Sequence, residues 1–382
     1  MELSDHPLES ELAEIAERAE PGRTARLAVR HWGWDGNGGA TLETTGRELG
    51  GITRERVRQL CERLARRLGE CEVDAPALDR ALVLAAHAVP TTALELARRL
   101  ADERIAARPF DPAGLLSAAA MLGRDPTFCL ETVKDVRVAL PYPPDPASDT
   151  AAVIEAVVDT ARAVVRRAGA ARVSDVKGRV AADLVAWVDD DLVTALVSEP
   201  EDFVWLERRT GWFYLPSVAK NAVASRVAKV LSVSGAVGIS DLHAGIRRDE
   251  RMREFVMPEY ILAELCRRLP GVKVEGGLVV ADSRQRPEDV LESTELALVR
   301  ALRDAGGEAD RRDLERVCLA AGMKPASFNN RIAYSPLITD LGHGRYGLRG
   351  AGPDGNGAGG EPVGDEIPRP GDLAAFRPPR RR

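Results

Sequence analysis

Apolar residues recur at helical spacing along most of the chain, and short paired apolar runs interrupt the helical stretches. The clearest stripe lies between residues 53 and 68 and follows one face of a helix with 3.6 residues per turn: Val57, Leu60, Cys61, Leu64 and Leu68. Shorter amphipathic helices are expected from Leu8 to Ala19 and over residues 24–31. Another short helix should begin after Thr41, a favourable N-cap, and end at Gly50-Gly51.

Four pairs of apolar runs, each divided by a short turn, follow this region and predict β-hairpins. Their turns begin near positions 134, 210, 276 and 343, which are 76, 66 and 67 residues apart. The turn residues are Lys134-Asp135, Thr210-Gly211, Gly276-Gly277 and Gly342-His343-Gly344. A polar-Asp-aliphatic helix start precedes three of them: Ser174-Asp175-Val176, Ser240-Asp241-Leu242 and Arg312-Asp313-Leu314. The copy near Pro90–Leu94 is degenerate, yet the spacing still indicates an internal repeat.

Each repeat therefore reads helix, turn, helix, helix, hairpin, which is the plan of a winged helix. The sequence predicts a mainly α fold with short β-hairpins, in which an N-terminal helix-turn-helix is followed by tandem winged-helix-like units. The expected divisions are an N-terminal segment 1–22, a helix-turn-helix 23–72, and units over 76–143 (degenerate), 150–217, 221–282 and 290–349. Residues 350–382 contain 14 Gly or Pro among 33 residues, which predicts a disordered tail.

Composition narrows the classes of function. The net charge of −6 excludes a chain that is basic throughout, so a DNA site would have to be a local basic patch. Five scattered cysteines without a C-x-x-C pair favour reduced thiols in a cytoplasmic protein and provide no zinc-ligand spacing. No apolar run approaches the ~18 residues of a membrane span, and the N-terminus lacks the features of a secretory signal. We therefore expect no membrane partner.

The predicted helix 53–68 is the local basic patch, because it carries six arginines against two glutamates, a charge of +4. Its first turns offer side chains that can hydrogen-bond base edges in a major groove: Arg54, Glu55, Arg58 and Gln59. Its flanks offer phosphate contacts: Thr53, Arg56, Arg63 and Arg67. The alternative is a solvated amphipathic helix whose glutamates and arginines pair with each other. The capped helix and glycine turn before it favour DNA.

Residues 41–68 resemble region four of the sigma-seventy class of bacterial RNA polymerase sigma factors, which reads the minus-thirty-five promoter element. The family run T-L-E-x-[IV]-G-R-E-[FL]-x-[VI]-T-R-E-R-[IV]-R-Q-[IL] is matched at Thr41, Leu42, Glu43, Gly46, Arg47, Glu48, Leu49, Ile52, Thr53, Arg54, Glu55, Arg56, Val57, Arg58, Gln59 and Leu60. The resemblance implies that Arg54, Glu55 and Gln59 contact bases. The turn departs from the family by one extra residue at Gly50-Gly51, and Thr45 replaces an aliphatic residue, which implies weaker packing between the two helices.

The resemblance covers about 45 residues, from roughly 24 to 68. Only about 40 residues precede the motif, too few for the region that melts promoter DNA in sigma factors, so an autonomous sigma factor is not expected. The whole chain resembles sigma-factor-like helix-turn-helix proteins that carry C-terminal winged-helix repeats.

The repeats themselves could bind DNA or protein, because a fold alone does not decide function. The acidic run Asp189–Asp191 would repel phosphate, so the second repeat favours a structural role or a protein contact. The third and fourth repeats contain candidates for secondary DNA contacts, for which ordinary solvated surface is an equal alternative: Arg247, Arg248, Asn329, Asn330 and Arg331.

Searches for catalytic motifs find no P-loop, no H-E-x-x-H and no G-x-S-x-G, so we expect no enzyme, no catalytic residues, no cofactor, no metal and no small-molecule substrate. The leading hypothesis is a cytoplasmic, nucleoid-associated regulator of transcription that binds specific sequences of double-stranded DNA. The alternative is a protein-interaction scaffold built from the repeats, with RNA polymerase as its candidate partner.

Overall fold

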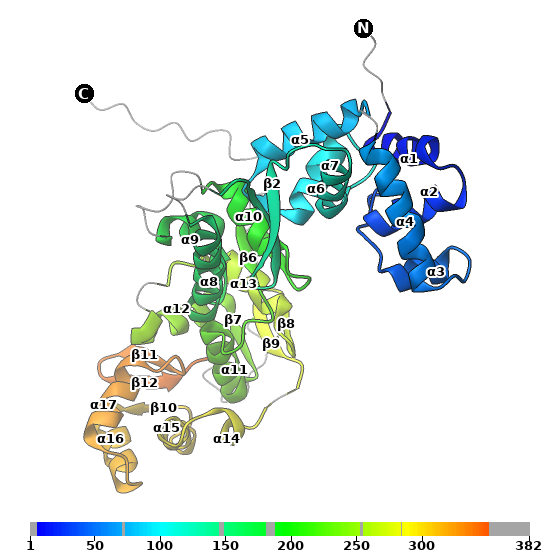
Figure 1. Ribbon diagram of the computed structural model, residues 1–382. Coiled ribbons are helices and arrows are strands. Elements are labelled where there is room, and N and C mark those ends of the chain that lie inside the picture. The colour runs from blue at the N-terminus through cyan, green and yellow to red at the C-terminus, as the bar shows by residue number, and fades with distance from the viewer. Residues whose placement is uncertain are drawn as a thin grey trace, which may run out of the picture. The chain divides into compact units, whose positions relative to one another are not determined.

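The computed structural model (Figure 1) describes residues 6–70, 73–144, 149–180, 188–252, 255–283 and 285–350, so nearly all of the expected tail 350–382 lies outside the described residues. The chain divides into two compact units. Unit 1 comprises Met1–Ser225 and Val256–Arg268, and unit 2 comprises Arg226–Phe255 and Leu269–Arg382. The expected third winged-helix-like unit, 221–282, is therefore shared between them.

Unit 1 begins with the four helices that the periodicity predicts: α1 (Leu8–Ala19), α2 (Arg23–Trp32), α3 (Leu42–Glu48) and α4 (Arg54–Gly69). The first repeat follows with α5 (Pro76–Ala88), β1 (Thr91–Thr92), α6 (Ala93–Asp102), α7 (Pro112–Met121), β2 (Phe128–Val133) and β3 (Val136–Pro141). The degenerate copy thus keeps a short strand ahead of its second helix. Lys134 and Asp135 form the hairpin turn with φ of 49° and 68°, the left-handed conformation that two-residue hairpin loops require.

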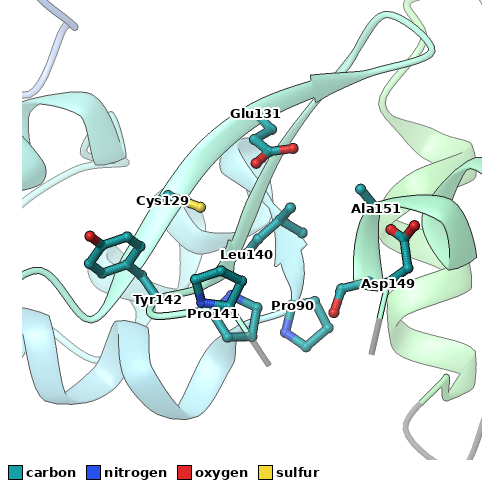
Figure 2. Close-up of a pocket in the computed structure, with 10 residues that line it drawn as sticks. Pro90, Cys129, Glu131, Leu140, Pro141, Tyr142, Asp149 and Ala151 are labelled. Atoms are coloured by element: carbon teal, nitrogen blue, oxygen red, sulfur yellow. The ribbon is translucent and has the colours of Figure 1, made fainter. Parts of the chain in front are cut away.

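The second repeat has the same order: α8 (Thr150–Ala168), β4 (Ala171–Arg172), α9 (Val173–Arg179), α10 (Asp190–Ser198), β5 (Val204–Glu207) and β6 (Trp212–Tyr214). A pocket of about 680 Å³ lies where the β2–β3 hairpin of the first repeat meets the start of α8, and Figure 2 shows Cys129, Glu131 and Asp149 among its lining residues. Nearby, Lys134 at the hairpin tip pairs with Glu155 of α8 at 2.9 Å. The two repeats are therefore joined by polar as well as apolar contacts.

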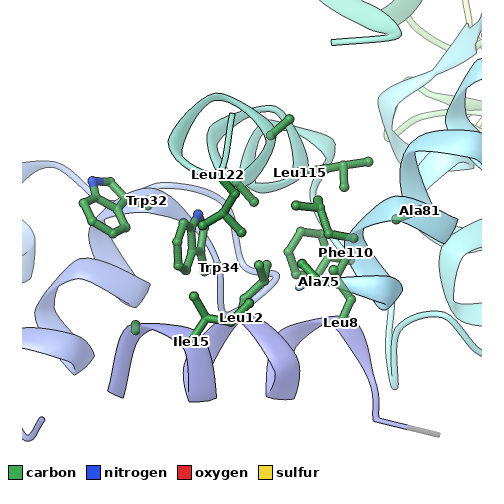
Figure 3. Close-up of a cluster of buried hydrophobic side chains, with 14 of the residues drawn as sticks. Leu8, Leu12, Ile15, Trp32, Trp34, Ala75, Ala81, Phe110, Leu115 and Leu122 are labelled. Atoms are coloured by element: carbon green, nitrogen blue, oxygen red, sulfur yellow. The ribbon is translucent and has the colours of Figure 1, made fainter. Parts of the chain in front are cut away.

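One hydrophobic core serves both the N-terminal helices and the first repeat (Figure 3). Leu12 of α1, Trp34 after α2, and Phe110 and Leu115 of the first repeat are all completely buried in this cluster. In addition, the Glu11 carboxylate of α1 accepts hydrogen bonds from backbone N–H groups in the first turn of α5. Segments 1–22, 23–72 and 76–143, which the sequence separates, consequently pack as one body.

Unit 2 contains most of α11 (Ala222–Ser234) and then β7 (Ala236–Gly238), α12 (Ile239–Arg248), a short 3-10 helix (Glu250–Met252), β8 (Val272–Glu275) and β9 (Leu278–Ala281). Helix α13 (Glu259–Arg268) belongs to unit 1. The fourth repeat consists of α14 (Pro287–Val290), α15 (Ser293–Asp304), β10 (Glu308–Asp310), α16 (Arg311–Ala320), α17 (Pro325–Tyr334), β11 (Ile338–Gly342) and β12 (Arg345–Leu348).

All four sheets found in the described residues have three antiparallel strands in one shared order. In each, the short strand ahead of the second helix pairs with the last strand of the hairpin, as β1 pairs with β3 and β10 with β12. The prediction of a mainly helical fold with short hairpins is confirmed.

Candidate nucleic-acid interface

Helices α3 and α4 are each capped by a threonine, as the sequence predicts. The Thr41 hydroxyl accepts from the backbone N–H of Thr44, and the Thr53 hydroxyl accepts from that of Arg56, so each satisfies one orphan donor of a first helical turn. The two helices meet closely at Gly46, where a Cβ atom would lie 2.4 Å from the carbonyl oxygen of Ile52. Only glycine fits this position.

An arginine from α2 holds the turn between α3 and α4. Arg23 donates from Nε to the carbonyl oxygen of Leu49 at 3.1 Å and from Nη2 to that of Gly50 at 2.9 Å. Gly50 and Gly51 have φ of 120° and 66°, which suits glycine. The extra glycine in the turn is thus accommodated by a specific clamp. Sequence reasoning missed Arg23, because nothing local marks a partner 26 residues away.

Helix α4 buries one face and exposes the other, as its periodicity predicts. Its five apolar stripe residues are buried, and the fully buried Thr45 of α3 leaves its hydroxyl without a hydrogen-bond partner among the described residues. All eight predicted DNA contacts of this segment are exposed: Thr53, Arg54, Glu55, Arg56, Arg58, Gln59, Arg63 and Arg67. The structure therefore leaves all of these side chains accessible on the part of α4 that is not buried.

The base-reading candidates bond to one another. Arg58 makes two hydrogen bonds to the Glu55 carboxylate, at 2.7 and 3.0 Å, and also pairs with Glu62. Gln59 donates to Glu55 at 3.1 Å. The hydrogen bonds from Arg58 and Gln59 hold the pKa of Glu55 below its usual value. This is the pairing that the solvated-helix alternative expects, yet such exposed pairs contribute little to stability and exchange readily for other partners.

Two of the predicted phosphate contacts also tie α4 to α1. Arg63 pairs with Glu20 at 3.1 Å and Arg67 with the same carboxylate at 3.4 Å, and Arg67 donates to the carbonyl oxygen of Ala19. By contrast, the side chains of Arg54 and Arg66 are exposed and make no hydrogen bond or ion pair within the described part of the chain. Arg56 bonds only the neutral amide of Gln59, so the cationic charge of α4 that no carboxylate pairs lies at Arg54, Arg56 and Arg66.

The predicted secondary contacts in unit 2 differ in their accessibility. Arg331 donates to Glu295 at 3.1 Å and also pairs with Glu292, so its guanidinium is held by carboxylates of α15 and of the residue before it. Arg248 donates to the carbonyl oxygen of Ile332 at 2.7 Å. Arg247, Asn329 and Asn330 are exposed. The structure keeps three of the five side chains at the surface of unit 2.

The titratable groups that line the pocket in Figure 2 include a thiol and a helix-capping carboxylate. Burial raises the pKa of the Cys129 thiol, which disfavours the reactive thiolate. Asp149 caps α8 by accepting from the Ala152 N–H at 3.0 Å. Among the described residues, no three or more His, Cys, Asp or Glu side chains are grouped so as to hold a metal ion.

No family model, curated protein or solved structure matches the chain. In the portion that the structure describes, no helix combines the length and apolar character needed to cross a membrane.

Proposed function

We propose that this protein is a sequence-specific DNA-binding regulator of transcription that inserts α4 into the major groove. The observation that carries the proposal is the exposed arginine-rich face of α4, on a helix whose other face is buried and whose preceding turn is clamped by Arg23. A helix that contacts base edges must keep a fixed orientation, and the buried face of α4 and the Arg23 hydrogen bonds to the preceding turn restrict its movement. The likeness of residues 41–68 to sigma region four supports the same surface.

In the proposed complex, the first two turns of α4 meet base edges. Arg54 can form a bidentate pair with guanine and Gln59 with adenine, while Glu55 can accept from cytosine. Arg58 leaves its glutamate partners for a base, and Arg56 reaches a phosphate. Each arginine that neutralises a phosphate releases counterions condensed on the DNA, so the affinity should fall steeply as the salt concentration rises.

We further propose that the four repeats are winged-helix units. Three helices, a short strand and a hairpin occur in the same order in each, and the shared strand pairing supports a common plan.

Selection from a random duplex pool tests the proposal. We expect the full-length protein to enrich a motif, and we expect the double variant R54A/Q59A to lose it while remaining folded, because both side chains are exposed. The variant R18A is a matched control, since Arg18 is an exposed arginine on α1 that pairs with Glu14. Equal enrichment by the wild type and R54A/Q59A would contradict reading by α4.

The second candidate function is a protein-interaction scaffold with RNA polymerase as its partner. It is favoured by the second repeat, where Asp189, Asp190 and Asp191 are all exposed and would repel phosphate. Size-exclusion chromatography with core RNA polymerase tests it. A stable complex without DNA would support the scaffold, and separate elution would oppose it.

A further inference from the structure

The third helix of a repeat is the one that would enter a groove in a helix-turn-helix protein. Unit 1 contains three such helices, and each packs against a segment outside its own repeat. In the first repeat, α7 has no charged side chain and packs against α2 and α4. In the second repeat, α10 packs against β1 of the first repeat and buries five of its nine residues. Helix α13 contacts β5 and buries four of its ten residues. Part of the surface of each of these helices is therefore used for packing against the N-terminal helices or another repeat.

Helix α17 of the fourth repeat is different, because it keeps one full face exposed. Only Phe328 and Ile332 of its ten residues are buried. The exposed positions recur at i, i+3, i+4 and i+7, which is one continuous stripe of a helix: Ala326, Asn329, Asn330 and Ala333. We call these four residues the α17 stripe. Its side chains are short and uncharged, so no large side chain of the stripe prevents this helix from approaching another surface closely.

One cationic side chain beside the α17 stripe is held in place by its contacts with α17. Arg311 lies 5.9 Å above the Phe328 ring and donates to Asn329 Oδ1 at 2.6 Å. Its backbone N–H also donates to the carbonyl oxygen of Gly344, at 2.8 Å, so the turn of the β11–β12 hairpin lies beside the start of α16. The fixed guanidinium of Arg311 therefore stands at the edge of the stripe.

Two further cations flank these positions in sequence. Arg312 follows Arg311 at the start of α16, and Lys324 immediately precedes α17. Both side chains are exposed, and neither makes a hydrogen bond or an ion pair within the described residues. Arg331 lies on the same helix as the stripe, but its guanidinium forms ion pairs with Glu292 and Glu295. The cations available to a ligand are thus the ones at the N-terminal ends of α16 and α17.

We propose that the α17 stripe, with Arg311, Arg312 and Lys324 at its rim, is a second surface for double-stranded DNA. The chemistry is complementary: asparagine amides can hydrogen-bond base edges, small neighbours permit entry into a major groove, and rim cations meet phosphates. This inference rests on the proposed function for its class of partner, but it uses a separate helix in a separate unit.

Hydroxyl-radical footprinting of the full-length protein on a selected long duplex tests this surface directly. We expect two protected segments. The variant N329A/N330A should lose the second segment and bind roughly tenfold more weakly, because two base-reading side chains are gone. The variant R312A/K324A should lower the slope of log affinity against log salt by about 1.8, since each phosphate contact contributes about 0.9.

The controls separate this inference from the proposed function. The variant R300A removes an exposed arginine of α15 that pairs with Glu288, and it should leave both segments and the salt slope unchanged. The second surface would be overturned if N329A/N330A and R312A/K324A behaved like the wild type. If R54A/Q59A lost the first segment in the same experiment, the proposal that α4 reads DNA would still be supported. Loss of the second segment in N329A/N330A, with R54A/Q59A equal to wild type, would support the second surface and contradict reading by α4. Absence of binding to any duplex by the wild type would overturn both.

Discussion

The guanidinium of Arg23 and the carbonyl oxygen of Gly50 are joined by a hydrogen bond of 2.9 Å that fixes the turn before the candidate DNA-reading helix. The same side chain bonds the carbonyl oxygen of Leu49, so the carbonyl groups of the two residues that follow α3 both accept from α2. Arg23 thus links the helix that supports the site to the turn that sets the direction of α4.

The variant R23A should lower the free energy of unfolding by about 1 kcal/mol, because two hydrogen bonds from a charged group at the surface are lost. DNA affinity should fall by more than this change in stability accounts for, since the orientation of α4 is no longer fixed. Urea denaturation and fluorescence anisotropy measure the two effects. The variant R26A is the control, because the Arg26 side chain is exposed on the same helix and makes no hydrogen bond or ion pair among the described residues. Equal affinity of R23A and R26A would contradict a clamp.

The variant G46A should destabilise the protein by about 1–3 kcal/mol, the usual cost of overpacking. Its new methyl group would lie 2.4 Å from the Ile52 carbonyl oxygen, so α3 and α4 must separate. The variant G69A is a matched control at the end of α4, where nothing lies within 4 Å, and alanine there should stabilise the helix by up to about 1 kcal/mol. Thermal unfolding should rank G69A above wild type and wild type above G46A, and the reverse order would contradict the close approach.

The shared core predicts that damage in the first repeat reaches the helix-turn-helix. The variant L115A removes a completely buried side chain of α7 and should cost about 2–5 kcal/mol. Hydrogen exchange followed by mass spectrometry should show faster exchange in α1 and α4 as well as in α7. L94A, at a leucine that is 39% exposed, should leave exchange in α1 and α4 unchanged. Faster exchange confined to α5–α7 in L115A would show two independent bodies instead.

The buried thiol of Cys61 predicts a loss of stability at alkaline pH. Burial raises the pKa of this thiol from 9.0 to about 11, so the folded state keeps the proton that the unfolded chain releases. The stability contribution is complete below pH 9 and is lost as the pH rises toward 11, by at most about 1.4 kcal/mol per pH unit. Chemical denaturation from pH 8 to 11 should show a steeper decline for the wild type than for C61A. Parallel curves would contradict this assignment.

The local features of α4 could be predicted from the sequence, because they depend on neighbours within one or two turns. The stripe from Val57 to Leu68 follows helical periodicity, and the caps at Thr41 and Thr53 need only the residues that follow them. Similarly, the hairpin turns are marked by their glycines or by Lys134-Asp135.

The features that the sequence did not reveal depend on residues far apart in the chain. The Arg23 clamp and the Glu11 cap on α5 join segments whose composition carries no mark of the partner. Arg331 was expected among secondary DNA contacts because arginine often reads bases, yet the buried carboxylate of Glu295, 36 residues away, binds it. Which of two chemically suitable partners an arginine takes is decided by tertiary packing.

The common core of the N-terminal helices and the first repeat has a mechanical consequence. When a DNA-binding helix is attached by a flexible linker, the neighbouring domains can rotate relative to it. In this chain, α5 and α7 contribute to the same hydrophobic core as α4. If α4 binds in the major groove as proposed, the first repeat would have a fixed orientation relative to the duplex. The outer surface of the first repeat would then lie at a fixed angle and distance from the bound DNA site.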